Sequence, residues 1–207
     1  MRVSDFMRGH SAGVFQLGMI GLMVVATSCS GPATGPKAAA VPATEYRTDL
    51  TIQDIMDSLV DPSADFLWAT VSTEVGPKGI VDKAPKTDAE WREVRRHAVL
   101  LMESANLLKI PGRGVARAGA KSSAPGVEEE PEGTKKLMDA DRASWDKAAD
   151  GLYEAAAVLL KAAEAKNAGN ILDAGNKLDE ACEGCHLKYW YPKQTEILKQ
   201  NAAAPKP

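Results

Sequence analysis

The chain has 207 residues, a formal net charge of -3 at pH 7, an aromatic content of 5% and many alanines. This length predicts one compact domain, and the composition favours helices over a sandwich of sheets. The charge balance gives no case for binding nucleic acid, which calls for a basic face.

The N-terminal segment predicts export. Arg2 and Arg8 precede an apolar run over 14–26 that is short for a membrane-spanning helix and fits the core of a signal peptide. We therefore expect a signal peptide over 1–28 and a location in the periplasm. The stretch that follows is rich in Gly, Pro and Ala, which predicts a flexible tether over 29–47.

The end of the leader carries a second signal. The residues Ala26-Thr27-Ser28-Cys29 resemble the lipobox of bacterial lipoproteins. In that family the cysteine is lipidated, so the resemblance implies a lipid on Cys29 and a tether to a bacterial membrane. Ordinary cleavage, which leaves or removes an unimportant thiol, is the alternative. No second long apolar run follows, so we expect the rest of the chain to be soluble, either free or tethered.

Apolar residues in steps of three and four predict amphipathic helices over 48–192. The first helix begins near Thr51. It is expected to be broken or kinked at Pro62, with Asp61 as the N-cap of its second part. Glycines and a proline over 76–79 then predict a loop.

Three further helices are expected after this loop. The second helix begins at Thr87 or Asp88 and ends before Pro111, the third runs from about Lys136 to Lys166, and the fourth runs from about Asn170 to Pro192. Residues 111–136 are expected to form a long surface loop and 193–207 a frayed tail. Four such helices, with a short link between the last two, predict an all-α antiparallel four-helix bundle without strands.

The segment Cys182-Glu183-Gly184-Cys185-His186 matches C-x-x-C-H, the attachment signature of c-type haem. Two thiols at i and i+3 share one helical face and can each add to a vinyl group on one porphyrin edge. His186 is at i+4 from Cys182, so its imidazole leaves the same face and can bind the iron. The motif predicts one haem c, bonded covalently to Cys182 and Cys185, with His186 as the proximal iron ligand.

Three other interpretations of the two cysteines compete with haem. An exported compartment permits a disulfide between them. Zinc would have only Cys182, Cys185 and His186, and no second cysteine pair completes a structural site. A redox dithiol usually stands at the start of a helix beside a strand, and the sequence predicts no strand.

With this motif near the end of a four-helix pattern, the chain resembles the class II cytochromes c, the cytochrome c′-like family, over approximately residues 48–192. It is also similar to a branch of periplasmic haem proteins through its segments 60–65, 103–108, 111–113 and 185–192. The resemblance implies a four-helix bundle, thioether bonds at Cys182 and Cys185, and His186 as the proximal ligand. Many relatives dimerise, which implies a homodimer as one arrangement for this chain.

The resemblance also suggests a second iron ligand. In the family, a residue of the first helix faces the sixth iron position. A methionine there gives an electron carrier, whereas Leu or Phe leaves the position open to small gases. Met56 matches best, and Met102 is the weaker candidate. A methionine on an apolar stripe can equally fill the core.

These observations favour outer-sphere electron transfer with redox partner proteins in the periplasm, and a chain that is not an enzyme. The alternative is a five-coordinate haem protein that binds or scavenges nitric oxide or carbon monoxide. Peroxidase-like chemistry ranks last because it needs a polar distal group, and the apolar face of the first helix is expected to offer none.

Overall fold

The structure is a computed structural model that describes residues 45–77, 79–194 and 199; the expected signal peptide and Cys29 lie outside the described residues. In chain order its elements are helix α1 (Ile52–Ile55), the π-helical turn η1 (Met56–Val60), helix α2 (Asp61–Trp68), strands β1 (Ser72–Gly76) and β2 (Gly79–Lys83), and helices α3 (Asp88–Leu108), α4 (Pro131–Ala140), α5 (Arg142–Glu164) and α6 (Ala168–Tyr189).

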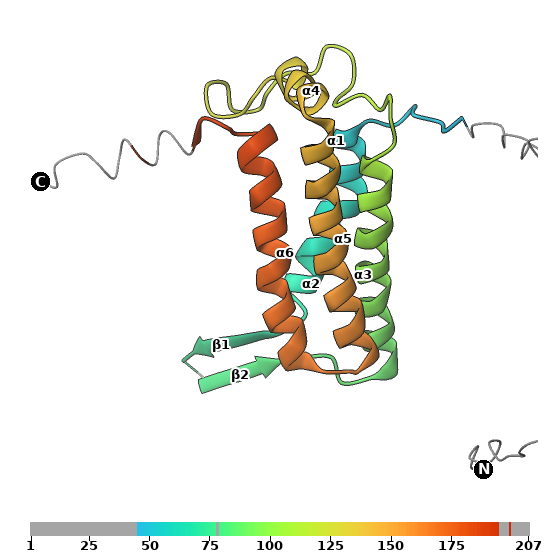
Figure 1. Ribbon diagram of the computed structural model, residues 1–207. Coiled ribbons are helices and arrows are strands. Elements are labelled where there is room, and N and C mark those ends of the chain that lie inside the picture. Colours follow the sequence, from blue (N-terminus) through green and yellow to red (C-terminus); the bar gives the residue numbers. More distant parts are fainter. Residues whose placement is uncertain (1–44, 78, 195–198, 200–207) are drawn as a thin grey trace, which may run out of the picture. The chain divides into compact units, whose positions relative to one another are not determined.

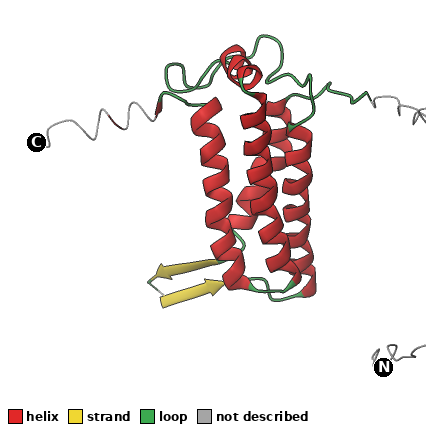
Figure 2. Ribbon diagram, viewed as in Figure 1, coloured by secondary structure: helices red, strands yellow, loops and turns green. Residues whose placement is uncertain are grey.

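The described part is mostly helical, with a small two-stranded sheet (Figures 1 and 2). Helix α3 packs against α5, α5 packs against α6, and α2 contacts both α3 and α6. The β1–β2 hairpin projects at one end of these helices, whereas α4 and the loops before it lie across the other end (Figure 1). The last turns of α6 reach this covered end.

The core is densest between α3 and α5. Ala98, Leu101 and Ala105 of α3 and Ala156 and Leu159 of α5 are all completely buried. Alanines let two helices approach closely, and the leucines between them fill the remaining space. The inward stripes expected for these two helices are therefore confirmed.

The boundaries of the long helices follow local capping. Thr87 is the N-cap of α3, because its hydroxyl accepts a hydrogen bond from the Glu90 N–H at 3.2 Å and the Glu90 carboxylate accepts one from the Thr87 N–H at 2.7 Å. The predicted start of the third helix, at about Lys136, was wrong. Helix α4 already begins at Pro131, and the chain leaves helical geometry at Asp141, whose side chain caps α5 by accepting from the Ser144 N–H at 3.1 Å.

The first helix is irregular just before Pro62, but Asp61 is not an N-cap. The backbone of Asp61 is helical, and its N–H donates to the carbonyl of Met56, five residues earlier, which makes a π-helical turn. Proline lacks an N–H, and its ring crowds the carbonyl four residues before it. The wider π-helical turn lets the helix continue into α2 in spite of Pro62.

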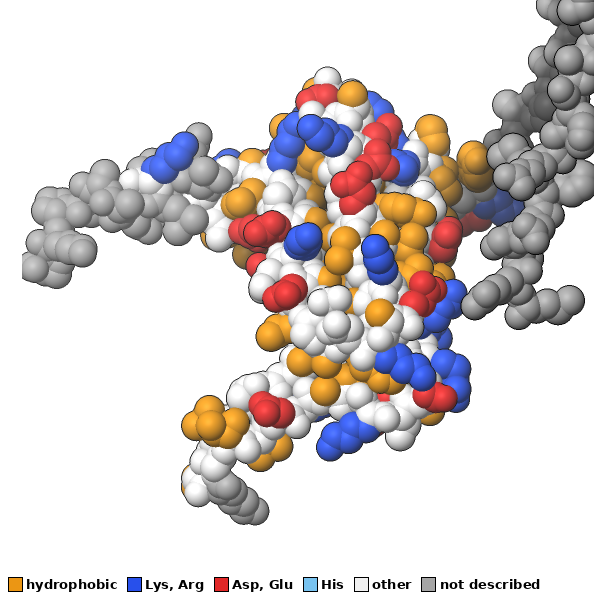
Figure 3. Space-filling view, turned by 60° about the horizontal axis from the view of Figure 1, so that its bottom comes forward, with side chains coloured by type: hydrophobic (Ala, Val, Ile, Leu, Met, Phe, Trp, Pro, Cys, Tyr) orange, Lys and Arg blue, Asp and Glu red, His pale blue; other side chains and the backbone are white. Residues whose placement is uncertain are grey.

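The prediction of a purely α-helical chain was wrong, because β1 and β2 pair as an antiparallel hairpin from Ser72 opposite Lys83 to Gly76 opposite Gly79. The Thr73 hydroxyl also donates to the Asp82 carboxylate at 2.7 Å. β-Branched residues suit a strand, but the glycine and proline of the turn dominated the sequence pattern and suggested a loop alone. Figure 3 shows hydrophobic side chains on this projecting hairpin, where 80% of Val75 and 71% of Ile80 are exposed.

Candidate functional site

A cavity of about 320 Å³ lies between the η1–α2 segment, the inner faces of α3 and α5, and the last turns of α6. Its walls are mainly apolar. They include Val60, Ala64, Leu108, Trp145, Ala149 and Leu152. Trp145 is buried and fixed, because its indole N–H donates to the carbonyl of Leu108 at 2.9 Å. The inner wall of the cavity is therefore apolar and held in place by this hydrogen bond.

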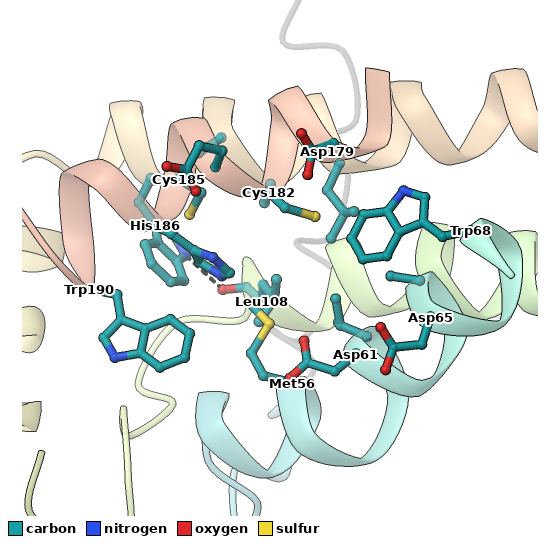
Figure 4. Close-up of a pocket in the computed structure, with 17 residues that line it drawn as sticks. Met56, Asp61, Asp65, Trp68, Leu108, Asp179, Cys182, Cys185, His186 and Trp190 are labelled. Atoms are coloured by element: carbon teal, nitrogen blue, oxygen red, sulfur yellow. Dashed lines mark hydrogen bonds between the residues drawn. The ribbon is translucent and has the colours of Figure 1, made fainter. Parts of the chain in front are cut away.

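The sequence-predicted residues Cys182, Cys185, His186 and Met56 all line this cavity. Figure 4 shows the two cysteines and His186 on α6, with Met56 across the cavity on the chain segment of the first helix. The three motif residues of α6 thus face one space, as their spacing along a helix predicts. The structure brings the four residues together around that space.

Both thiols are free and half-buried. Burial is the main cause that raises the pKa of Cys182 to about 12 and that of Cys185 to about 11. The two groups are therefore neutral thiols at physiological pH. Among the described residues, no three or more His, Cys, Asp and Glu side chains are arranged to hold a metal ion by themselves.

The His186 imidazole stands among aromatic rings. Its centroid is 4.9 Å from that of Trp190 and 5.8 Å from that of Tyr191, in edge-on contacts. The Tyr191 hydroxyl donates to the Glu183 carboxylate at 2.7 Å, which ties the chain after α6 back to the motif. Burial lowers the pKa of His186, with the nearby Glu183 acting against it. A neutral imidazole is the form that binds a metal.

Met56 reaches the cavity through the irregular backbone of the first helix. It is the first residue of η1, and its carbonyl accepts the Asp61 N–H that closes the wide turn. Its side chain is half-buried and packs on the core. Met102, the weaker candidate for the sixth ligand, is half-buried on α3. It lines neither this cavity nor a second cavity that adjoins it.

Carboxylates around the cavity are a feature that the sequence analysis missed. Asp61 and Asp65 line it from α2, and Asp179 lines it from α6 (Figure 4). Glu183 of α6 lines it as well. Burial, followed by the charges of Asp57 and Asp65, raises the pKa of Asp61. The expectation that the first helix offers no polar group to this space was therefore wrong. The sequence contained a signal for this, because Asp57, Asp61 and Asp65 are four residues apart and residues at that spacing share one helical face.

A second cavity of about 180 Å³ adjoins the first and shares Met56, Cys185 and His186 with it. One of its walls is formed by residues between 115 and 134, part of the 111–136 stretch that was expected to be a long surface loop. Two hydrogen bonds fix this segment on the end of α6. The Glu129 N–H donates to the Trp190 carbonyl at 2.5 Å, and the Thr134 hydroxyl donates to the Tyr189 carbonyl at 2.9 Å.

His97 of α3 lines neither of the two cavities. Its ring stacks on Phe66 with centroids 4.1 Å apart, and its Nδ1 lies 3.2 Å from the Ser63 hydroxyl. Burial lowers its pKa. It is thus a packing contact between α3 and α2.

Searches for similar proteins found no match to this chain among protein-family models, curated proteins or solved structures. No helix among the described residues is long and apolar enough to cross a membrane. Cys29, the expected lipid site, belongs to the part of the chain outside the described residues.

Proposed function

We propose that this chain is an exported c-type cytochrome that carries one haem c on Cys182 and Cys185, with His186 as the proximal ligand. The observation that carries the proposal is the convergence of two free thiols, a neutral imidazole and a methionine on one apolar cavity. These groups fit a c-type haem, because the two thiols stand at i and i+3 on one face of α6 and the imidazole follows at i+4. We also propose that the long helices and the first-helix segment form the antiparallel four-helix bundle.

The haem, when bound, supplies a one-electron couple between ferrous and ferric iron. The residues of the chain supply the attachment of the haem, the ligation of its iron and the wall around it. Cys182 and Cys185 would hold the macrocycle, and burial lowers the pKa of His186, which favours the neutral form that binds a metal. Trp145 and Leu152 exclude water from one side. A haem held against this apolar wall would serve outer-sphere electron transfer with redox partner proteins in the periplasm.

We propose Met56 as the sixth ligand. It stands across the cavity from His186 and belongs to the only π-helical turn among the described residues, a feature that often marks functional sites. Methionine ligation raises the reduction potential of a haem. Met56→Leu should therefore lower the midpoint potential and remove the ferric absorption band that marks Met–iron bonding. Met102→Leu, which changes a methionine outside both cavities, should leave both unchanged.

The first test is the visible spectrum of the full chain, matured in a periplasm that attaches haem. Colour that survives denaturation and acid-acetone extraction, with a low-spin ferric spectrum, is expected for a methionine-ligated carrier. Loss of the pigment into acid-acetone would contradict covalent attachment. A high-spin, five-coordinate spectrum with rapid carbon monoxide binding would instead assign the chain to the gas-binding alternative.

We further propose that Cys29 carries a lipid and tethers the protein to a membrane on its periplasmic side. The support is the basic leader, the apolar run and the small residues before the cysteine. Wild-type protein is then expected in the membrane fraction, and Cys29→Ala in the soluble fraction. Identical fractionation of the two proteins would contradict lipidation.

A further inference from the structure

Two aromatic residues that follow α6 lie against the imidazole of His186. The Trp190 ring stands nearly perpendicular to it, at 89°, with centroids 4.9 Å apart (Figure 4). The Tyr191 ring is inclined to it by 63°, with centroids 5.8 Å apart. Edge-to-face pairs of rings are favoured at centroid distances of about 4.5–7 Å. The imidazole therefore has two ring contacts of favourable geometry.

Backbone hydrogen bonds fix the place of the Trp190 ring. The N–H groups of Trp190 and Tyr191 both donate to the His186 carbonyl at 2.9 Å, which closes the end of α6. The Trp190 carbonyl in turn accepts a hydrogen bond from the Glu129 N–H at 2.5 Å. The backbone of Trp190 is therefore held on one side by α6 and on the other by the 111–136 stretch.

A side-chain hydrogen bond holds the second ring. The Tyr191 hydroxyl donates to the carboxylate of Glu183, which lies on α6 three residues before His186. Tyr191 is half-buried, whereas 42% of Trp190 is exposed. A tryptophan gains most from the hydrophobic effect when its indole leaves water completely. Burial of its own ring therefore explains the position of Trp190 only in part.

The imidazole of His186 has ring contacts where a metal ligand usually has a hydrogen bond. A histidine that binds a metal almost always donates its other ring N–H to a carboxylate, a carbonyl or water, which fixes the orientation of the ring. Among the hydrogen bonds between described residues, a histidine ring takes part only in the one between His97 and Ser63. The contacts with Trp190 and Tyr191 can replace the missing bond, because rotation of the imidazole would move its edge into these rings.

We infer that Trp190 and Tyr191 are positioning residues, which hold the His186 imidazole in the plane in which it binds the haem iron. This inference rests on the proposed function, since it assumes the haem. Both residues act through His186 and not on the iron itself. The inference also gives the 111–136 stretch a role, because the Glu129 N–H of that stretch holds the carbonyl of Trp190.

The first test is proton NMR of the wild-type full-chain holoprotein. Ferrous haem with bound carbon monoxide is diamagnetic whichever group holds the sixth position in the free protein, so contacts close to the iron can be measured. Overhauser contacts between the ring protons of His186 and those of Trp190 are expected. Their absence in a protein that carries covalent haem would overturn the positioning role. Absence of covalent pigment would instead overturn the haem assignment itself.

The second test measures the haem-methyl resonances of the ferric holoprotein, whose pattern depends on the plane of the proximal imidazole. Trp190→Leu removes the ring and should change this pattern, whereas Trp190→Phe keeps an aromatic edge and should retain most of it. Tyr191→Leu should cause a smaller change, since its ring lies farther from the imidazole. Tyr153→Leu is the matched control, because it removes an exposed ring of α5 outside both cavities and should leave the pattern unchanged.

The wild-type pattern in both Trp190→Leu and Tyr191→Leu would overturn the positioning role. A changed pattern in Trp190→Leu that Trp190→Phe largely restores would support it, because a general loss of packing would not depend on an aromatic edge. If a leucine variant carries no covalent haem, the Overhauser contacts of the wild-type protein decide between the two outcomes.

Discussion

Helices α5 and α6 both turn one stripe toward the interior, yet the two stripes differ. In α5 the stripe is buried along its whole length, from Trp145 to Ala163. In α6 it is buried through Leu178, becomes half-buried at Cys182 and Cys185, and is buried again at Tyr189. Close packing is the normal state of a protein interior. The interrupted stripe therefore marks the part of α6 whose neighbour is a cavity rather than another helix.

The largest expected effect comes from removing the thiols in the interrupted stripe of α6. Cys182→Ala combined with Cys185→Ala should abolish covalent pigment, because no sulfur remains to bond a vinyl group. Haem staining of the denatured chain after periplasmic maturation measures this directly. Cys29→Ala, which removes the other cysteine, should keep the stain. Covalent pigment in the double variant would contradict the assigned attachment.

A substitution in the uninterrupted stripe of α5 should instead change the free energy of unfolding. Leu159 is completely buried, so Leu159→Ala removes packing and leaves a cavity, which should lower the free energy of unfolding by about 2–5 kcal/mol. Urea unfolding of the holoprotein measures this loss. Leu172→Ala on α6 is the matched control: 56% of Leu172 is exposed, and the change should stay within about 0.5 kcal/mol. Equal losses in the two variants would mean that the α3–α5 contact is not the main core.

The third prediction concerns the two thiols in protein without haem. Burial raises the pKa of Cys182 to about 12 and that of Cys185 to about 11, above the ordinary thiol value of 9.0. Between pH 9 and these raised values, the unfolded chain has lost thiol protons that the folded chain still holds. The free energy of unfolding should therefore fall as the pH rises from 9 toward 11 to 12. Solvent reaches both half-buried groups, so the effect should be smaller than that of Leu159→Ala.

Urea unfolding of the apoprotein at a series of alkaline pH values checks this sign. The same protein with Cys182→Ala and Cys185→Ala should lose less stability over that range, since it has no thiols there to ionise. A steeper alkaline loss in the alanine variant would show that other groups cause the effect.

The smallest expected effect is at the contact between the two segments that flank the cavity. The Trp68 indole N–H donates to the Gly175 carbonyl at 3.1 Å and so joins α2 to α6. Trp68→Phe removes this hydrogen bond and should lower the free energy of unfolding by about 0.5–1.5 kcal/mol. Trp190→Phe is the control, since the two tryptophans are similarly exposed, at 40% and 42%, and the indole of Trp190 makes no hydrogen bond among the described residues. A larger loss for Trp190→Phe would contradict the role of the Trp68 contact.

Much of the helical organisation was predictable because its causes are local. The Thr87 cap, the end of α3 before Pro111 and the buried stripes of α3 and α5 follow from residues within a few positions of one another. The hairpin was missed because its apolar residues face solvent, so no buried stripe indicated it. The true start of α4 was hidden by the glycines and prolines that surround it.

For the candidate site, the sequence alone determined the motif and the helical face that Cys182, Cys185 and His186 share, since spacing along one helix fixes both. Only the tertiary structure decided what that face meets. It brought Met56 across the cavity by a π-helical turn, lined the space with carboxylates from α2 and α6, and joined the 111–136 stretch to the end of α6 through the hydrogen bond from the Thr134 hydroxyl to the Tyr189 carbonyl. These contacts join segments up to about 130 positions apart, and packing between distant segments depends on the whole fold rather than on local spacing.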